Sequence, residues 1–313
     1  MPDLTTRIAG LSMRTPVMLA SGTAGYGTEL RGLVDFGCVG AIVTKTVTPA
    51  PRAGNSPPRL AETPCGLLNA IGLENVGLAA FLEEKLPAAA ALGPPVIVSI
   101  AAEDPGAFAR LAAAVGSRAE AAALEVNVSC PNVARARRPA WDDPVAAGAI
   151  VRAVKASTTK PVLVKLSPNT ADPEGMAEAA EEAGADALVV ANTLPGMRID
   201  VEGRRPALGN VTGGLSGRAI LPVNLALVWK TAGVVSVPIV GSGGIGTADE
   251  ALEYLMAGAS AVQVGTALFA DPEAPASISR GITERMKSDG VESVAEYVGM
   301  AREGTWRETI RAA

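Results

Sequence analysis

Short apolar runs alternate with longer alanine-rich runs along most of the chain. The short runs are continuously apolar, which is typical of parallel strands covered on both faces. They predict strands at Val17–Ala20, Ala41–Lys45, Val96–Ile100, Leu124–Val128, Val162–Leu166, Ala187–Ala191, Ile239–Gly241 and Ala261–Val264. The alanine-rich runs predict helices at Leu78–Ala91, Ala107–Val115, Pro144–Ala156, Pro173–Ala183, Leu221–Ala232 and Ala248–Met256. Strands that alternate with helices in this way indicate a parallel α/β sheet.

The regular alternation also predicts how the sheet is arranged. Asp172 followed by Pro173 is typical of a helix start, and Gly184 is typical of a helix end. Eight strand–helix units without a break in composition predict a closed (β/α)8 TIM barrel, a single domain over residues 1–313. An open, doubly wound sheet is the alternative.

Three segments are longer than ordinary strand-to-helix loops. They are Thr46–Asn75, Ser129–Asp143 and Thr193–Ala219, and each is rich in Gly, Pro, Asn and Arg. In a barrel all three would follow strand carboxyl ends, so they would lie over the same mouth. Long loops at that position usually carry function.

Composition and charge exclude several classes of protein. With 48% hydrophobic and 19% charged residues, the 313-residue chain is not disordered. A net charge of −5 argues against nucleic-acid binding. The most apolar stretch, residues 86–102, is interrupted by Gly93 and two prolines, so no membrane span is expected. The charged first residues do not resemble a secretion signal.

The choice of reactive residues narrows the chemistry further. The chain contains no histidine, which excludes Ser-His-Asp triads and histidine-bound zinc. Its three cysteines, Cys38, Cys65 and Cys130, are too few and too widely spaced for an iron–sulfur cluster or a disulfide framework. No metal site is expected, and a cytoplasmic location fits best.

Small residues follow the last two predicted strands. Gly243 and Gly244 follow the seventh, and Gly265 and Thr266 follow the eighth. In barrels, the loops after these two strands often bind phosphate through backbone N–H groups. Either pair alone would be interpreted as turn residues, but the two together predict a phosphate site.

Cys130 and two lysines are the candidate reactive groups. Cys130 follows the fourth strand in a polar loop, where the absence of histidine leaves it as the best-placed proton acceptor. Lys45 and Lys165 end the second and fifth strands among apolar residues, which is typical of charges that face an anionic ligand. A Schiff-base role for Lys165 is an alternative, as are snorkelling surface lysines.

Three asparagines complete the predicted mouth. Asn127 and Asn192 end or follow strands, and Asn69 lies in the first long loop. Loop asparagines often only form turns. At strand ends, however, their amides suit a planar ligand that has both donors and acceptors.

Taken together, the motifs resemble those of class 1 dihydroorotate dehydrogenases, and within them the class 1B subgroup. The resemblance covers essentially the whole chain. It rests on Ala20-Ser21-Gly22-Thr23, Thr44-Lys45-Thr46, Asn69-Ala70-Ile71-Gly72-Leu73, Asn127-Val128-Ser129-Cys130-Pro131-Asn132, Val164-Lys165-Leu166-Ser167-Pro168, Ala191-Asn192-Thr193, Thr212-Gly213-Gly214-Leu215-Ser216-Gly217, Gly243-Gly244 and Gly265-Thr266. The segment around Cys130 is the most specific of these.

The resemblance implies one bound FMN per chain. Its phosphate would be held by Gly243, Gly244, Gly265 and Thr266, with Gly217 nearby. The other cofactor-binding residues it implies are Ser21, Lys45, Thr46, Ser99, Asn127, Lys165 and Ala191. Lys165 would lie near the N1–O2 edge of the flavin ring. Class 1B proteins usually carry asparagine where this chain has the shorter Ser99.

The resemblance also implies a substrate and a reaction. Dihydroorotate would be oxidised to orotate in pyrimidine biosynthesis, with Cys130 removing the C5 proton and Lys165 as the second catalytic residue. The substrate-binding residues would be Lys45, Asn69, Ala70, Ile71, Gly72, Leu73, Asn127, Asn192 and Thr193. A flavin barrel acting on neutral pyrimidines is an alternative, because it shares the Asn-x-Ser-Cys-Pro arrangement. A non-enzymatic scaffold subunit is a further alternative.

The resemblance to class 1B further implies a partner. A barrel filled by FMN leaves no second unit for NAD, so electrons must leave through another molecule. Class 1B enzymes pass them to a subunit with FAD and a [2Fe-2S] cluster, which reduces NAD. A central homodimer in a heterotetramer is therefore expected, and a fumarate-using class 1A enzyme is the alternative.

Overall fold

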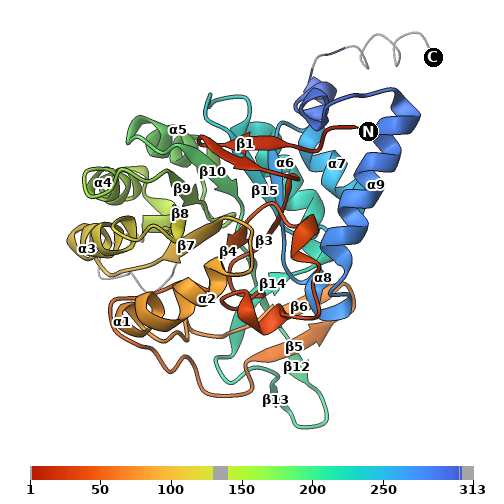
Figure 1. Ribbon diagram of the computed structural model, residues 1–313. Helices are drawn as coiled ribbons and strands as arrows, with labels where there is room; N and C mark the ends of the chain where they lie inside the picture. The colour runs from red at the N-terminus through yellow and green to blue at the C-terminus, as the bar shows by residue number, and fades with distance from the viewer. Residues whose placement is uncertain (1, 130–139, 303, 305–313) are drawn as a thin grey trace.

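The computed structural model describes residues 2–129, 140–302 and 304. Within them, eight parallel strands close into a barrel that follows the order of the chain, with helices around it (Figure 1). The barrel strands are β3 (Val17–Leu19), β4 (Ile42–Val43), β7 (Val96–Ile100), β8 (Ala121–Asn127), β9 (Val162–Lys165), β10 (Ala187–Val190), β15 (Ile239–Ser242) and β16 (Ala261–Val264). The predicted TIM barrel is confirmed, and the open sheet is excluded.

The outer layer consists of helices that follow the barrel strands. They are α1 (Leu78–Ala80), α2 (Leu86–Ala90), α3 (Pro105–Gly116), α4 (Pro144–Lys155), α5 (Pro173–Glu182), α6 (Leu221–Thr231), α7 (Ala248–Met256), α8 (Ala267–Ala270) and α9 (Ala274–Asp289). A π-helical turn, Phe81–Lys85, joins α1 to α2, so the predicted helix over residues 78–91 is present with a change of pitch. Asp172 caps α5 by accepting a hydrogen bond from the Gly175 N–H, as its sequence predicts.

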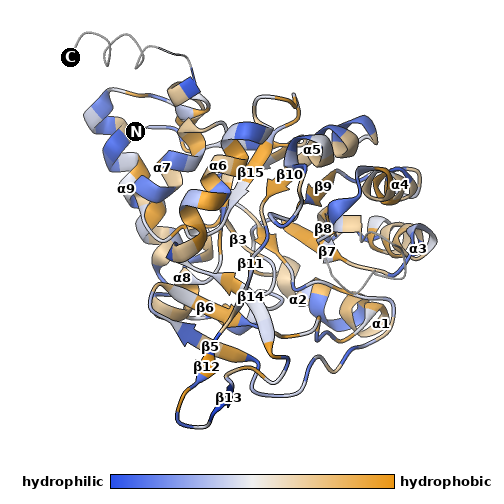
Figure 2. Ribbon diagram, turned by 180° about the vertical axis from the view of Figure 1, so that it is seen from behind, coloured by the Kyte–Doolittle hydropathy of each residue, from blue (hydrophilic) through white to orange (hydrophobic). Residues whose placement is uncertain are grey.

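The apolar core of the described residues has two large parts, besides a small cluster of Leu68, Ala70 and Leu208 in the long loops. One lies between the barrel strands and the helices, and Figure 2 shows apolar residues on the strands and polar ones on the outer helices. The other fills the amino end of the barrel interior with residues such as Met18, Ile97 and Leu163. An amino-terminal hairpin, β1 (Thr6–Ile8) and β2 (Leu11–Met13), packs Ile8 and Met13 against this interior part and closes that end.

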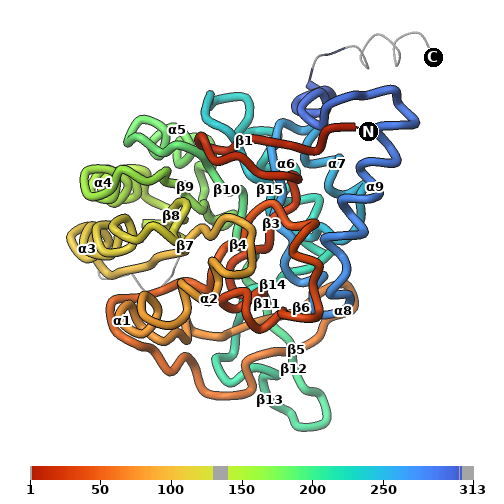
Figure 3. The backbone as a smooth tube through the Cα atoms, in the orientation of Figure 1, coloured from red at the N-terminus to blue at the C-terminus, as the bar shows by residue number. Residues whose placement is uncertain are grey.

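Two of the long loops at the carboxyl end, Thr46–Asn75 and Thr193–Ala219, carry strands of their own, which the sequence did not predict. They form a four-stranded antiparallel sheet of β5 (Leu60–Thr63), β6 (Gly66–Asn69), β11 (Leu194–Met197) and β14 (Thr212–Ser216). A small hairpin, β12 (Ile199–Asp200) and β13 (Arg205–Pro206), extends beyond it. The backbone trace in Figure 3 shows these strands at the end of the molecule opposite β1.

No helix in the described ranges is both long and apolar enough to span a lipid bilayer.

Candidate active site

A cavity of about 1210 Å³ opens at the carboxyl ends of the barrel strands. It is lined by strand ends and by both long loops that carry the extra sheet. The predicted site residues that line it are Ser21, Lys45, Thr46, Asn69, Ala70, Ile71, Gly72, Leu73, Asn127, Lys165, Ala191, Asn192, Thr193, Gly217, Gly243, Gly244, Gly265 and Thr266. Residues from nine separate chain segments thus meet around one space. Cys130 lies outside the described residues.

The glycine turns after β15 and β16 form one wall of the cavity. Gly243 and Gly244 have φ angles of 127° and 81°, a conformation that favours glycine. A Cβ atom at Gly243 would also collide with the buried side chain of Asn224. Helix α7 begins directly after this turn, and Thr247 caps it by accepting a bond from the Glu250 N–H (3.3 Å). Exposed backbone and a helix amino terminus together suit an anion such as phosphate.

Lys45, which follows β4, supplies a positive charge to the same cavity. Its side chain is half-buried, and within the described residues its ammonium has no hydrogen-bond or ion-pair partner. Burial lowers the pKa of Lys45 from the usual value; the Glu74 carboxylate partly counteracts this, and Arg59 adds to it. An unpaired, half-buried cation that lines a cavity is suited to bind an anionic ligand.

Two asparagine amides are held in fixed orientations at the mouth. Asn127 accepts a hydrogen bond from the Ser129 N–H (3.2 Å), and Asn192 accepts one from the Thr193 N–H (2.8 Å). Neither side-chain nitrogen has a protein partner within the described part of the chain. In Asn69 the engaged atom is the amide nitrogen instead of the oxygen, because this nitrogen donates to the Gly214 carbonyl (3.1 Å). The cavity therefore presents amide donors and an amide acceptor to one ligand.

Hydroxyl groups connect the first, second and third barrel strands. The Ser21 hydroxyl donates to the Thr44 carbonyl (2.8 Å), and the Thr46 and Ser99 hydroxyls are 2.9 Å apart. Ser99 is fully buried and is not among the residues that line the cavity. The structure thus places Ser99 behind Thr46, where it holds a cavity-lining side chain in place.

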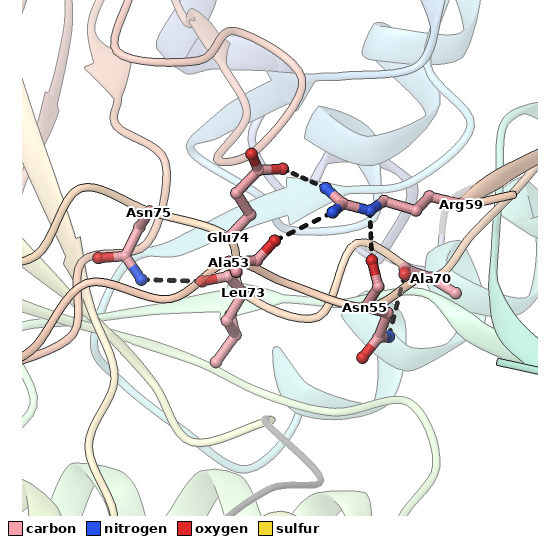
Figure 4. Close-up of polar contacts among 7 residues, drawn as sticks. All are labelled: Ala53, Asn55, Arg59, Ala70, Leu73, Glu74 and Asn75. Carbon is pink, nitrogen blue, oxygen red and sulfur yellow. Dashed lines mark hydrogen bonds and ion pairs between the residues drawn. The ribbon is translucent and has the colours of Figure 1, made fainter. Parts of the chain in front are cut away.

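The loop that carries Asn69 to Leu73 is fixed by the side chain of Arg59 (Figure 4). Its guanidinium donates to the Asn55 carbonyl (2.5 Å) and the Ala53 carbonyl (3.0 Å) and pairs with the Glu74 carboxylate (2.5 Å). The Asn55 amide in turn donates to the Ala70 carbonyl (3.0 Å). Arg59 therefore links the segment around Asn55 to Glu74. This link holds the backbone of residues 70–73, which lines the cavity.

Sequence reasoning missed two polar residues inside the barrel. Glu125 and Gln263 lie on β8 and β16 within otherwise apolar runs, and both are buried. Lys165 donates to the Gln263 side chain, which donates to Glu125. The signal was present in the chain, because a charged or amide residue inside a buried strand must have a polar partner.

Comparison with known proteins agrees with this geometry. The family model for dihydroorotate dehydrogenase matches residues 3–286. The chain is 50% identical, over 298 residues, to "Dihydroorotate dehydrogenase B (NAD(+)), catalytic subunit" of Pelobacter propionicus, covering 95% of this chain and 98% of the relative. It is 48% identical over 298 residues to the protein of the same name from Geobacter sulfurreducens, with the same coverage.

A solved structure has the same fold. The dihydroorotate dehydrogenase of Eimeria tenella, crystallised with ferulenol, superposes with a TM-score of 0.81 over 97% of this chain and 89% of the other, at 24% identity. Family-model coverage of most of the chain and near-complete alignment at about half identity carry the conclusion. The chain belongs to the dihydroorotate dehydrogenase family.

Proposed function

We propose that the chain is the FMN-containing catalytic subunit of an NAD-linked dihydroorotate dehydrogenase, which oxidises dihydroorotate to orotate in pyrimidine biosynthesis. Its relatives at about half identity are named "Dihydroorotate dehydrogenase B (NAD(+)), catalytic subunit". One observation carries the proposal for this chain: a single cavity joins the glycine wall to Lys45 and the asparagine amides. It can hold a phosphate and a planar anion side by side. A single barrel domain over residues 1–313 contains the whole site.

The residues of the glycine wall fit FMN. The turns at Gly243–Gly244 and Gly265–Thr266 present backbone rather than side chains, and a Cβ at Gly244 would meet Leu221. Gly217 (φ 88°) approaches the Gly66 backbone closely at the same end. These residues would hold the phosphate. Ser21, Lys45, Thr46, Asn127, Lys165 and Ala191 would contact the rest of the cofactor, and Ser99 would support Thr46.

The other half of the cavity fits dihydroorotate. Its carboxylate would be received by Lys45 and by the backbone of residues 70–73, while Asn69, Asn127, Asn192 and Thr193 would bind the amide edges of the ring. Neutral pyrimidines such as dihydrouracil lack the carboxylate. The feature that favours the acidic substrate is Lys45, whose ammonium has no partner among the described residues.

The reaction removes a proton and a hydride from neighbouring carbons. FMN, when bound, supplies the hydride acceptor for C6 of the substrate. Cys130 takes the C5 proton, and its position in sequence, three residues after Asn127, supports this role. Asn127 holds the start of that loop through the Ser129 N–H. Lys165 provides a fixed positive charge at the base of the cavity, where charge develops during hydride transfer.

Electrons then leave the chain through a partner. The printed names of the relatives contain "catalytic subunit", which favours a second subunit in this case as well. A subunit with FAD and a [2Fe-2S] cluster would carry electrons to NAD, around a central homodimer of this chain. The fumarate-using alternative would need no such subunit.

The experiment is an anaerobic visible spectrum of the purified chain. We expect flavin bands that bleach on addition of dihydroorotate and remain unchanged with dihydrouracil as the matched neutral probe. Fumarate or NAD added to the bleached protein alone should not restore the bands, whereas adding the partner subunit with NAD should. A protein that stays colourless when FMN is supplied would overturn the proposal. Bleaching by dihydrouracil alone would favour the neutral-pyrimidine alternative. Restoration of the flavin bands by fumarate would favour the class 1A alternative.

A further inference from the structure

Three polar side chains are buried together at and below the floor of the cavity. Lys165 is 6% exposed, Gln263 is 1% exposed and Glu125 is fully buried. A charged group in the interior is costly unless it is paired and hydrogen-bonded. The family reaction assigns a role to Lys165, but the proposed chemistry uses neither Gln263 nor Glu125.

The three side chains form a continuous hydrogen-bonded relay. The Lys165 ammonium donates to Gln263 Oε1 (3.1 Å), and Gln263 Nε2 donates to Glu125 Oε2 (2.8 Å). An ammonium can only donate and an ionised carboxylate can only accept, so the two charges together determine which way the Gln263 amide faces. One neutral amide thus links a buried cation to a buried anion.

The relay crosses the barrel interior. Gln263 extends from β16, whereas Glu125 and Lys165 lie on the adjacent strands β8 and β9 on the other side of the barrel. Lys165 and Gln263 line the cavity, but Glu125 does not. Glu125 is two residues before Asn127 on the same strand face, and its register partners are Ser99 and Leu163. The carboxylate therefore lies one layer below the floor on which a ligand rests.

Glu125 also retains an unused acceptor. Its Oε1 atom is buried and has no hydrogen-bond partner among the described residues. Buried ion pairs generally add little stability compared with apolar residues of similar volume. Stability alone therefore does not account for a carboxylate here, and its remaining effect is electrostatic. In a low-dielectric interior, its charge acts on Lys165 and on whatever lies against Lys165.

We propose that Glu125 is a positioning and charge-balancing residue, which acts through Gln263 to hold the Lys165 ammonium at the cavity floor and to lower the reduction potential of the flavin bound there. The inference rests on the FMN site proposed above. Lys165 favours the negative charge that reduction adds to the ring, and Glu125 offsets part of that field. A lower potential suits onward transfer of electrons to NAD.

The test is a spectroelectrochemical titration of the FMN-loaded protein. Glu125→Gln keeps the shape and can still accept from Gln263, so it removes only the charge. We expect the oxidised–reduced equilibrium to shift at least tenfold toward the reduced form, which is about 30 mV upward for a two-electron couple. Glu125→Asp retains the charge and should restore most of the wild-type potential.

Two further variants keep the test decisive. Gln263→Met removes the amide through which Glu125 acts on Lys165. It should therefore shift the potential in the same direction, even if Glu125→Gln fails to fold. Leu163→Met, at the register partner of Glu125, alters the packing of the same layer without changing charge and should leave the potential unchanged.

The outcomes separate the two proposals. Flavin that binds normally but has wild-type potential in both Glu125→Gln and Gln263→Met would overturn the role of Glu125 and leave the proposed function intact. An equal shift in Leu163→Met would identify a packing effect and would also overturn it. A wild-type protein that binds no FMN would overturn the proposed function and this inference together.

Discussion

The two ends of the barrel interior have opposite chemistry although the same strands form both. At the amino end, the inward side chains are apolar, and the β1–β2 hairpin closes over them with Ile8 and Met13. At the carboxyl end, the inward side chains include Lys165, Gln263 and Asn127. The inward side chains change from apolar to polar within two residues of a strand, as from Leu163 to Lys165 on β9.

The comparison shows how a barrel separates stability from chemistry. Alternation along a strand points every second side chain inward, so moving two residues along the strand moves one layer through the interior. The interior toward the amino end, which is apolar except for the buried Glu125, holds the strands in register, and the layer above it presents charges and amides to the cavity. Changes at the two ends should therefore affect different measurements.

The largest effect is expected from removing Cys130, the proposed proton acceptor of the reaction. Cys130→Ala should slow flavin bleaching by dihydroorotate roughly 10²–10⁴-fold, because no histidine is present to replace the thiol. Anaerobic stopped-flow absorbance measures this step. Cys65→Ala is the matched control, since Cys65 also lines the cavity but has no assigned role. Equal rates in wild type and Cys130→Ala would show that another group accepts the proton.

A substitution at the apolar end should lower the stability of the protein and leave its ligand affinity nearly unchanged. Leu163 is 1% exposed in the interior cluster, and Leu163→Ala should reduce the free energy of unfolding by about 2–5 kcal/mol through lost burial and a cavity. Urea unfolding measures the loss, and orotate affinity at low temperature should stay within about threefold of wild type. Val145→Ala, at a residue 77% exposed, is the control. A loss of orotate affinity without a loss of stability would contradict the separation of the two ends.

Sequence reasoning predicted the regular part of the molecule well. The eight barrel strands are mostly apolar and buried, so their pattern identified them, with boundaries that differ by up to three residues. The largest difference is at β8, which begins at Ala121, because alanine is a weak strand former. The prediction that strand ends and glycine turns surround one space is supported by the cavity, which depends mainly on parallel strands ending together.

The extra sheet was not predictable in the same way. β14 consists of Thr-Gly-Gly-Leu-Ser and β11 contains Pro195 and Gly196, residues that disfavour strands. These strands form because of pairing with distant segments: Gly214 on β14 pairs with Asn69 on β6. Local propensity carries no information on such pairings. The Lys165–Gln263–Glu125 relay was missed for a similar reason, since its members come from three strands on two sides of the barrel.

The charge at the mouth gives a pH-dependent prediction. Burial lowers the pKa of Lys45 below its usual value of 10.5, so its ammonium deprotonates at lower pH than a free lysine. Deprotonation removes the attraction for a carboxylate, and orotate affinity should therefore fall as pH rises through that pKa, by roughly tenfold or more for a charge-assisted hydrogen bond. Orotate titrations from neutral to alkaline pH measure this. Lys45→Met should bind weakly and show no such decline; a decline that persists in it would assign the titration elsewhere.

The smallest effect is expected where the polar and apolar layers meet, at Ser99. The Ser99 hydroxyl contacts Thr46 at 2.9 Å but does not line the cavity. Ser99→Ala should cost about 1 kcal/mol of unfolding free energy for the lost hydrogen bond, with FMN affinity changed less than about threefold. Thr46→Val removes the same bond from a side chain that does line the cavity, so fluorescence titration with FMN should show a larger loss for it. If Ser99→Ala weakened FMN binding as much as Thr46→Val, the two hydroxyls would act as one unit. Ser99 would then belong to the polar layer that binds the ligand and not to the layer beneath it.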